Sequence, residues 1–328
     1  MATVPVPKQL DADSGLTIVS ELLSHANAQE LTVDFSTLKF ARPFGTLIFA
    51  ETLRHLIQTR KATGLPTRYR TDGVVSGQRS SAVSYLGHVG FFEHLGINYG
   101  KLPGEAPGSR DYLPITRVTQ ASLRANCQSG PLQRAVMDES TRLAKMIFSD
   151  ECKQDMLGYC LRETIRNVFE HAQIEECTVM AQRYNGVEVE IAIVDRGIGI
   201  MRSLSSRYSI SDEVAALHAA ILPGVTCAAI TTDSEWENTG YGLYVLSTLG
   251  RKLGSFRLVS SGAALSARKS GVDTSINAFP GTAIKLRVTA ADADYFSNLL
   301  QQIVDDGELK AGNQPGQPRR ASKSARVG

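Results

Sequence analysis

The chain has 328 residues, of which 42% are hydrophobic and 21% are charged, and its formal net charge is +2. This length and composition are typical of a globular protein with two domains, each with an ordinary hydrophobic core. The small net charge excludes a protein that binds nucleic acid through a general positive field, and no stretch approaches the ~18 consecutive apolar residues of a membrane span.

The cysteine pattern indicates free thiols. The five cysteines are Cys127, Cys152, Cys160, Cys177 and Cys227, and none forms a CxxC pair. An odd number without such pairs argues against a disulfide framework or a zinc site and favours a reducing compartment. The first residues also lack the basic start and apolar core of a signal peptide. We therefore expect a cytoplasmic protein.

The first third of the chain alternates between helical and strand patterns. Apolar residues at helical spacing predict helices, and alternating apolar residues predict strands. In chain order the patterns predict a helix over 14–28, a strand over 31–35, a helix over 44–60, a strand over 67–70 and a helix over 80–95. A loop rich in Gly and Pro follows over 98–112 and leads to a strand over 113–118. We expect a small α/β domain over residues 1–115.

The rest of the chain predicts a second domain over residues 116–306. The expected elements are helices over 131–149 and 152–172, strands over 177–184 and 187–194, helices over 211–222 and 241–252, strands over 255–260 and 282–288, and a helix over 291–305. Asn185-Gly186 is a strong hairpin signal between the first two of these strands. The order favours an α+β sandwich over a doubly wound sheet. Residues 307–328 predict a disordered basic tail.

A polar segment of the helix over 152–172 could carry chemistry. Glu163, Asn167 and His171 are four residues apart and share one helix face. The Asn oxygen is a suitable ligand for Mg²⁺, and a carboxylate one turn away can activate a water or a hydroxyl group. A solvated polar face has the same spacing, so this segment alone does not decide between the two readings.

A strand that ends in an acid followed by glycines is a second candidate. Asp195 ends the strand over 187–194 and precedes Gly197 and Gly199. Glycine lets the backbone turn sharply and approach a ligand closely, and the Asp can accept a hydrogen bond from an exocyclic amine such as that of adenine. An ordinary Gly-rich turn has the same pattern.

A third candidate lies at the start of the helix over 241–252. Gly240, Gly242 and Leu243 are part of the run Thr239-Gly-Tyr-Gly-Leu-Tyr244. Glycines at a helix start expose backbone N–H groups, and a helix N-terminus attracts phosphate. Flexible glycines before any helix are again the plainer interpretation.

In this order and spacing, the three segments resemble the N, G1 and G2 boxes of the GHKL superfamily, which includes DNA gyrase, Hsp90, histidine kinases, MutL and the anti-sigma-factor kinases. Gly224-Val-Thr226 stands where the family's ATP lid often carries a Gly and a Ser or Thr. Gly281-Thr282 resembles the family's closing Gly-Thr. The resemblance covers residues 130–300 and implies a Bergerat fold, an α/β sandwich with ATP between a mixed sheet and a mobile lid.

The resemblance also implies ATP and Mg²⁺ as cofactors and a role for particular residues. These are Glu163 as general base, Asn167 on Mg²⁺, Asp195 and Thr282 on the adenine amine, Gly197 and Gly199 beside the base, Gly224 and Thr226 in the lid, and Gly240, Gly242 and Leu243 on the phosphates.

The branch of the family follows from the N box. Histidine kinases usually carry a basic residue three positions after the Asn, where this chain has Glu170. The spacing from Asn167 to His171-Ala172 is similar to that of the anti-sigma-factor serine kinases. Gyrase-like and Hsp90-like proteins would need a further domain after the ATPase module.

The N-terminal half resembles a STAS domain, the fold of the anti-sigma-factor antagonists. The resemblance covers residues 12–100 and rests on the strand over 31–35, the helix-opening Gly45 and the apolar pattern over 85–97. Phospho-regulated STAS proteins carry an Asp-Ser or Asp-Thr pair before that glycine, whereas this chain has Arg42-Pro43-Phe44. We therefore expect a docking or regulatory domain without the usual phospho-switch.

Together these features predict an ATP-binding regulatory protein. One hypothesis is a Mg²⁺-dependent protein serine/threonine kinase or slow ATPase in a partner-switching pathway, acting on a STAS protein or a sigma-factor-like partner. A second hypothesis is a non-catalytic, nucleotide-gated interaction switch. A third is a structural protein in which the motifs are coincidental. The sequence leaves a homodimer open and favours a solvated tail over one that binds nucleic acid.

Overall fold

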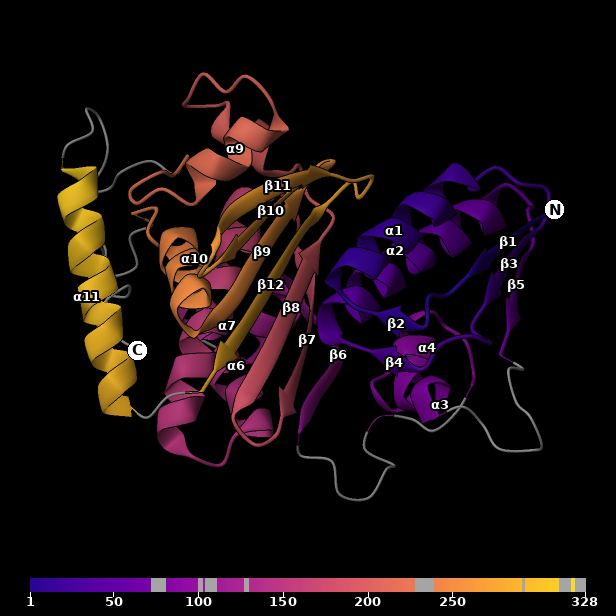
Figure 1. The fold of residues 1–328 in the computed structure, drawn as a ribbon, viewed down its shortest axis with the longest axis horizontal. Coiled ribbons are helices and arrows are strands. Elements are labelled where there is room, and N and C mark those ends of the chain that lie inside the picture. Colours follow the sequence, from indigo (N-terminus) through magenta and orange to yellow (C-terminus); the bar gives the residue numbers. More distant parts are fainter. Residues whose placement is uncertain are drawn as a thin grey trace.

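The computed structural model describes residues 1–71, 81–99, 103, 111–126, 130–227, 239–290, 293–312 and 320–321. The chain is a mixed α/β protein with two main sheets and helices on both faces of the larger sheet (Figure 1). Among the described helices, none combines the length and the apolar character needed to cross a membrane. We call residues 1–99 the N-terminal unit and residues 111–312 the C-terminal unit.

The N-terminal unit is built on a parallel three-stranded sheet. Its elements are β1 (Ala2–Pro5), β2 (Gln9–Leu10), α1 (Ala12–Ser24), β3 (Leu31–Asp34), β4 (Phe40–Ala41), α2 (Pro43–Ala62), β5 (Thr67–Arg70), α3 (Ser81–His88) and α4 (Phe91–His94). The sheet order is β1-β3-β5. Strand β3 buries Leu31 and Val33, the period-2 pattern of a sheet with one covered face. Helices α1 and α2 provide that cover.

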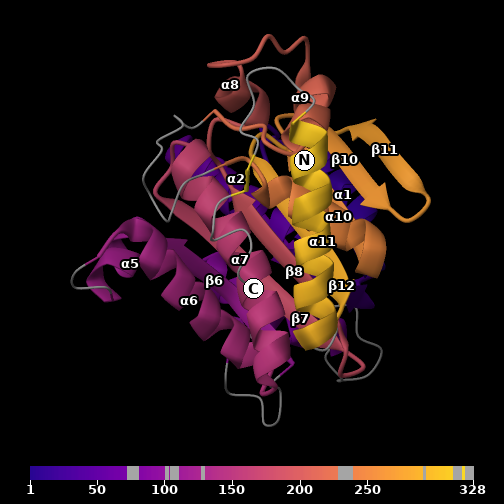
Figure 2. The ribbon, with the colours of Figure 1, turned by 90° about the vertical axis from the view of Figure 1, so that its left-hand side faces the viewer.

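The C-terminal unit is built on an antiparallel seven-stranded sheet in the order β11-β10-β9-β12-β8-β7-β6. Its strands are β6 (Tyr112–Thr119), β7 (Glu176–Tyr184), β8 (Glu188–Asp195), β9 (Gly254–Ser260), β10 (Ala263–Arg268), β11 (Gly271–Ile276) and β12 (Thr282–Thr289). Its helices are α5 (Gln120–Asn126), α6 (Leu132–Ile147), α7 (Glu151–His171), α8 (Ile200–Leu204), α9 (Glu213–Ala220), α10 (Gly242–Leu253) and α11 (Ala293–Ala311). Helices α6, α7 and α10 cover one face of the sheet, and α11 lies outside them (Figures 1 and 2).

The N-terminal unit packs against the opposite face of the large sheet, with α1 and α2 between the two sheets (Figure 1). Phe44, Leu47 and Ile48 of α2 are fully buried in one apolar cluster with Val194 of β8 and Ala283 of β12. Because this cluster takes residues from both units, it joins them through a common core rather than through a polar surface contact.

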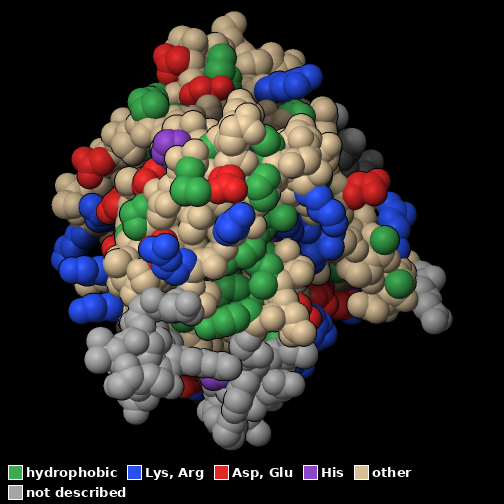
Figure 3. Space-filling view, turned by 90° about the vertical axis from the view of Figure 1, so that its right-hand side faces the viewer, with side chains coloured by type: hydrophobic (Ala, Val, Ile, Leu, Met, Phe, Trp, Pro, Cys, Tyr) green, Lys and Arg blue, Asp and Glu red, His purple; other side chains and the backbone are tan. Residues whose placement is uncertain are grey.

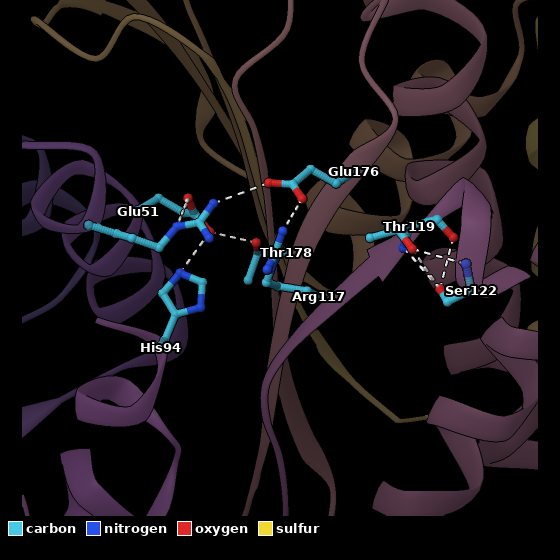
Figure 4. A network of polar contacts seen from close by, with 8 residues as sticks. Glu51, His94, Arg117, Thr119, Ser122, Glu176 and Thr178 are labelled. Carbon is cyan, nitrogen blue, oxygen red and sulfur yellow. Dashed lines mark hydrogen bonds and ion pairs between the residues drawn. The ribbon is translucent and has the colours of Figure 1, made fainter. Parts of the chain in front are cut away.

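A buried polar network crosses the same interface (Figure 4). The Glu51 carboxylate on α2 accepts a hydrogen bond from Thr178 on β7, and it lies 2.9 Å from His94 Nε2. Arg54 links Glu51 to Glu176 of β7, with nitrogen–oxygen distances of 3.7 and 3.1 Å. These partners replace the water that the Glu51 carboxylate loses on burial. Because they come from both units, the network also fixes how the two units meet.

The exposed side of the N-terminal unit shows no single sign of charge. Lys and Arg side chains and Asp and Glu side chains are both scattered over this face (Figure 3). On β5, the exposed Arg68 and Arg70 pair with Glu30 and Asp34. This face of the N-terminal unit therefore carries charges of both signs.

The boundary between the units differs from the sequence prediction. Residues 112–115, assigned from sequence to the first domain, belong to β6, which pairs with β7 in the large sheet. A single strand beside a long loop carries no sequence signal of the sheet that it will join.

At the C-terminal end of the second unit, α11 runs to Ala311, into the predicted disordered tail. It does so because Ala311 is buried and Gly307 packs against the Tyr244 ring. Most of residues 313–328 lies outside the described residues.

Other elements also differ from the predicted ones: β1, β2, β4, α5 and α8 were not predicted. The helix expected over 80–95 is divided into α3 and α4 at Gly90, whose φ is +79°. The hairpin β10–β11 was not predicted, since β10 is buried on both faces and shows no alternation. The expected neighbours β9 and β12 do pair, and β10–β11 extends the sheet outside β9.

Candidate functional site

A cavity lies between the large sheet and its helices, on the face away from the N-terminal unit. About 710 Å³ of space lies between its walls, including the part open to solvent. Its floor contains Leu258 of β9 and Thr282 and Ile284 of β12, and its walls come from α7, α8, the segment after α9 and the start of α10. A cavity with mostly apolar walls and a few polar groups is the usual form of a small-molecule site.

Asp195 is the acidic group of this cavity. It ends β8, is 6% exposed, and accepts a hydrogen bond of 2.8 Å from the N–H of Gly197. Burial raises the pKa of Asp195 to about 7. Its cross-strand neighbour on β12 is Thr282, so a hydroxyl group stands beside it. A buried carboxylate that forms no ion pair with a described residue retains free acceptor positions for a ligand amine.

The glycines after Asp195 shape the turn for packing reasons. A Cβ on Gly197 would lie 2.3 Å from the carbonyl oxygen of Ala172, at the end of α7, and that oxygen accepts the N–H of Ile198. Gly199 has φ +80° and lines the cavity. The strict need for Gly197 therefore comes from close contact with α7, whereas Gly199 both turns the chain and faces the cavity.

The polar face of α7 reaches the cavity only in part. Asn167 and His171 line it, whereas Glu163 does not. Residues four apart on an α-helix differ by roughly 40° around the axis, so Glu163 is turned by roughly 80° from His171. Glu163 is 4% exposed and its carboxylate lies 3.1 Å from both Nε and Nη2 of Arg162. The amide nitrogen of Asn167 is buried without a hydrogen-bond partner among the described residues.

The N-terminus of α10 meets this part of α7. A Cβ on Gly242 would lie 2.8 Å from Glu163 Oε2 and 3.6 Å from Asn167 Nδ2, so a larger residue here would require the Glu163 side chain to shift. The side chain of Tyr241, the N-cap residue of α10, makes no capping hydrogen bond to the helix. The first N–H groups of α10 thus have no side-chain cap from that residue, which is the arrangement that favours an anion.

The loop before α10 is held by two glycines. Gly224 and Gly240 have φ values of +80° and +76°, and the N–H of Gly224 donates to the carbonyl of Gly240 over 3.2 Å. Thr226 lines the cavity and is 3% exposed. Residues 228–238 of the segment that the sequence assigned to a lid lie outside the described residues.

The structure brings together most of the residues predicted from the sequence. Those that line the cavity are Asn167, Asp195, Gly199, Thr226, Gly240, Gly242, Leu243 and Thr282. Those that do not are Glu163, Gly197 and Gly224. The last three lie directly behind the lining residues and support the turns or the helix contact that form the walls.

Sequence reasoning missed the polar contacts of Cys227, which lines the cavity. The sulfur of Cys227 lies 3.1 Å from Oγ of Ser203 and 3.3 Å from Nδ1 of His171. These residues are distant in the chain and form no local pattern. Ser260 was missed too, although its hydroxyl accepts the N–H of Ile200 and so holds the turn after Gly199.

Comparisons of the chain with protein-family models, with curated proteins and with solved structures find no match.

Proposed function

We propose that this chain is an ATP-binding regulatory protein of the GHKL type, similar to the anti-sigma-factor serine kinases. One observation carries the proposal. Three segments that resemble the family's boxes, around Asn167, Asp195 and Gly242, are far apart in the sequence and border one cavity. An accidental set of glycines and acids has no reason to converge in this way.

The end of the cavity beside Asp195 suits an adenine base. The Asp195 carboxylate would accept the exocyclic amine, and the Thr282 hydroxyl beside it would complete the polar edge. Apolar groups such as Val168, Ile200 and Ile284 line the same cavity and would contact the faces of the ring. The low exposure of Asp195 strengthens such a hydrogen bond, because little water competes for the carboxylate.

The end of the cavity beside α10 suits phosphate and Mg²⁺. The N–H groups of Gly242 and Leu243, at the start of α10, would meet phosphate oxygens. Asn167, whose amide nitrogen has no partner among the described residues, could turn its oxygen toward Mg²⁺. The part of the chain that the structure describes contains no cluster of three or more His, Cys, Asp and Glu able to hold a metal ion. Phosphates and water would therefore supply the remaining ligands, as is common for Mg²⁺.

The N-terminal unit, which resembles a STAS domain in sequence, would act by docking. The segment where phospho-regulated relatives carry their acceptor is buried against the large sheet. The N–H of Phe44 donates to Glu190 of β8 over 3.2 Å, and Arg42 lies 3.4 Å from the same carboxylate. The start of α2 thus already receives a negative charge from the C-terminal unit, which supports a fixed contact within the chain rather than a phospho-switch.

A second candidate is a switch that binds nucleotide without turnover. Glu163, the expected general base, is paired with Arg162 and does not line the cavity. In this geometry the carboxylate is held by Arg162 behind the cavity wall rather than at the cavity surface, which disfavours its action on an attacking water. Closure over ATP would then alter the surface offered to a protein partner without any chemical step.

Isothermal titration calorimetry of the full chain with ATP and Mg²⁺ tests the proposal. We expect the wild type to bind and Asp195→Asn to bind about 10- to 100-fold more weakly, because a hydrogen bond to a charged group is lost. Asp138→Asn, an exposed acid on α6, is the matched control and should bind like the wild type. A folded wild type that binds no ATP would overturn the proposal. An assay of phosphate release then distinguishes an enzyme that turns over ATP from a switch that only binds it.

A further inference from the structure

Cys227 lies in the wall of the cavity, and the proposed nucleotide contacts do not use it. Two polar side chains hold its sulfur, His171 of α7 at 3.3 Å and Ser203 of α8 at 3.1 Å. All three residues line the cavity. A half-buried sulfur is therefore fixed beside an imidazole and borders space that a small molecule can enter.

The surroundings favour the nucleophilic form of this sulfur. The hydrogen bond with His171 holds the pKa of the Cys227 thiol below its usual value, and this effect outweighs that of burial. The thiolate, not the thiol, attacks electrophiles. The other buried cysteines are different, since burial raises the pKa of Cys160 to about 12 and that of Cys177 well above its usual value.

Other groups around Cys227 hold its backbone. Arg207 and Tyr208, which follow α8, both donate hydrogen bonds to the carbonyl of Thr226, over 3.2 and 3.3 Å. Together with His171 and the Asp195 carboxylate on the cavity floor, they are the charged and titratable groups on the described elements around the sulfur. The thiol and the backbone next to it are thus held by contacts from α7, from α8 and from the residues that follow α8.

We propose that Cys227 is a covalent modification site for small disulfides, and that its modification closes the cavity. The Cys227 thiolate attacks one sulfur of a disulfide RSSR of the glutathione class. A new S–S bond forms, the original S–S bond breaks, and RS⁻ leaves with its electron pair, so the cysteine is oxidised and the leaving half is reduced. The attached group then occupies space beside Thr226 that a ligand would need. That this ligand is a nucleotide rests on the function proposed above.

Labelling of the native full-length chain with oxidised glutathione tests the site, with peptide mass mapping to assign each cysteine. We expect Cys227 to react about tenfold or more faster than the partly exposed Cys152, and Cys160 and Cys177 to remain unmodified until the protein unfolds. His171→Ala should move the midpoint of the rate–pH profile of Cys227 to higher pH, an effect that loss of packing alone would not produce. Equal rates at Cys227 and Cys152, or an unchanged profile in the variant, would overturn the assignment.

The effect on the cavity is measured separately. Modified protein should lose at least about tenfold in ATP affinity and regain it after reduction with dithiothreitol. Cys227→Ser should show the same ATP affinity with and without glutathione disulfide treatment, whatever its own affinity is. Modified Cys227 with undiminished ATP affinity would refute closure. If the unmodified protein binds no ATP, the proposed function fails, while the labelling rates still decide whether Cys227 is the reactive site.

Discussion

Asp195 carries an ionisable group at a place from which water is largely excluded. Its pKa of about 7, raised by burial, means that near neutral pH the side chain is divided between its charged and neutral forms. A ligand that donates a hydrogen bond to the carboxylate favours the charged form and so lowers that pKa. Affinity, proton release and stability should therefore all depend on pH through this one residue.

The pH dependence of binding is the first prediction. Because the ionised fraction of Asp195 rises from about one tenth at pH 6 to about nine tenths at pH 8, ATP affinity should increase about tenfold over this range. Calorimetry in buffers of different ionisation enthalpy should detect protons released on binding near pH 7. Asp195→Asn should abolish this release; if the variant still releases the same protons, another group is responsible.

The stability of the ligand-free protein should change in the opposite direction. The folded pKa lies above the ordinary value of 3.8, so ionisation of Asp195 destabilises the fold, and stability contributed by the neutral form is lost as pH rises from about 4 to about 7. Asp195→Asn keeps an oxygen for Gly197 N–H and removes the charge. At pH 8 it should be more stable than the wild type, by as much as ~4 kcal/mol in urea unfolding, with little difference at pH 4. A variant that is less stable at pH 8 would contradict this account.

Glu163 separates the two candidate functions. Glu163→Gln keeps the shape of the side chain and weakens its pairing with Arg162. We expect ATP affinity within about threefold of the wild type, because Glu163 does not line the cavity. If the wild type releases phosphate and Glu163 is the general base, the variant should release phosphate at least tenfold more slowly. Turnover that is unchanged in a folded variant would exclude this role, and the absence of turnover in the wild type would favour the switch.

At the scale of elements, the contact between α7 and α10 defines the phosphate end of the cavity. The two helices approach closely because α10 begins at a glycine, and the side chain of Glu163 fills the space that a Cβ would occupy. The turn after β8 is likewise held against the end of α7, through the hydrogen bond between Ile198 and Ala172. Helix α7 is thus the common wall on which the other two segments are placed.

Two glycine substitutions on these helices should have opposite effects. A Cβ on Gly158, inside α7, would lie 3.9 Å from its nearest neighbours, so Gly158→Ala should stabilise the protein by about 0.5–1 kcal/mol and leave ATP binding unchanged. Gly242→Ala would place a methyl group at the start of α10, where Gly242 lines the cavity, and should weaken ATP binding at least tenfold. Urea unfolding and calorimetry on both variants provide the comparison. Equal ATP affinity in the two variants would exclude the N-terminus of α10 as the phosphate site.

At the scale of the whole molecule, the two units share one apolar interface and a buried polar network. Burial raises the pKa of Glu51, but hydrogen bonds from His94 and Thr178 and the charge of Arg54 outweigh it and hold the pKa below its usual value of 4.5. A lowered carboxylate pKa gives stability that is present above pH 4.5 and is lost as the pH falls through the folded pKa. The interface should therefore weaken in acid before the separate cores do.

We expect Glu51→Gln to destabilise the chain by about 3 kcal/mol at pH 7, because Arg54 loses a buried counter-charge and His94 loses its carboxylate partner. Glu30→Gln, which removes an exposed pair with Arg68, should cost less than about 0.5 kcal/mol. Urea unfolding should show one transition in the wild type and an earlier loss of the interface in Glu51→Gln, without the acid dependence that the Glu51 carboxylate gives the wild type. Equal stability of the two variants would mean that the buried network does not join the units.

The sequence alone determined the order of most elements and singled out several of the residues that line the cavity. Local signals sufficed there, because glycines at Gly199 and Gly240 are required by the backbone itself and strand ends and helix starts have short-range patterns. Whether the arrangement is the STAS-like and GHKL pair that the motifs resemble stays a proposal.

Only the tertiary structure decided which side chains face one another. Helical spacing placed Glu163 with Asn167, yet only Asn167 lines the cavity, and the Glu163 carboxylate pairs with the adjacent Arg162. The sulfur of Cys227 meets His171 from a position 56 residues away. The pairing of β6 with the large sheet and the packing of α2 against β8 likewise became visible only in the tertiary structure. Such contacts depend on how whole elements pack, and side-chain type and spacing along the chain carry no record of that packing.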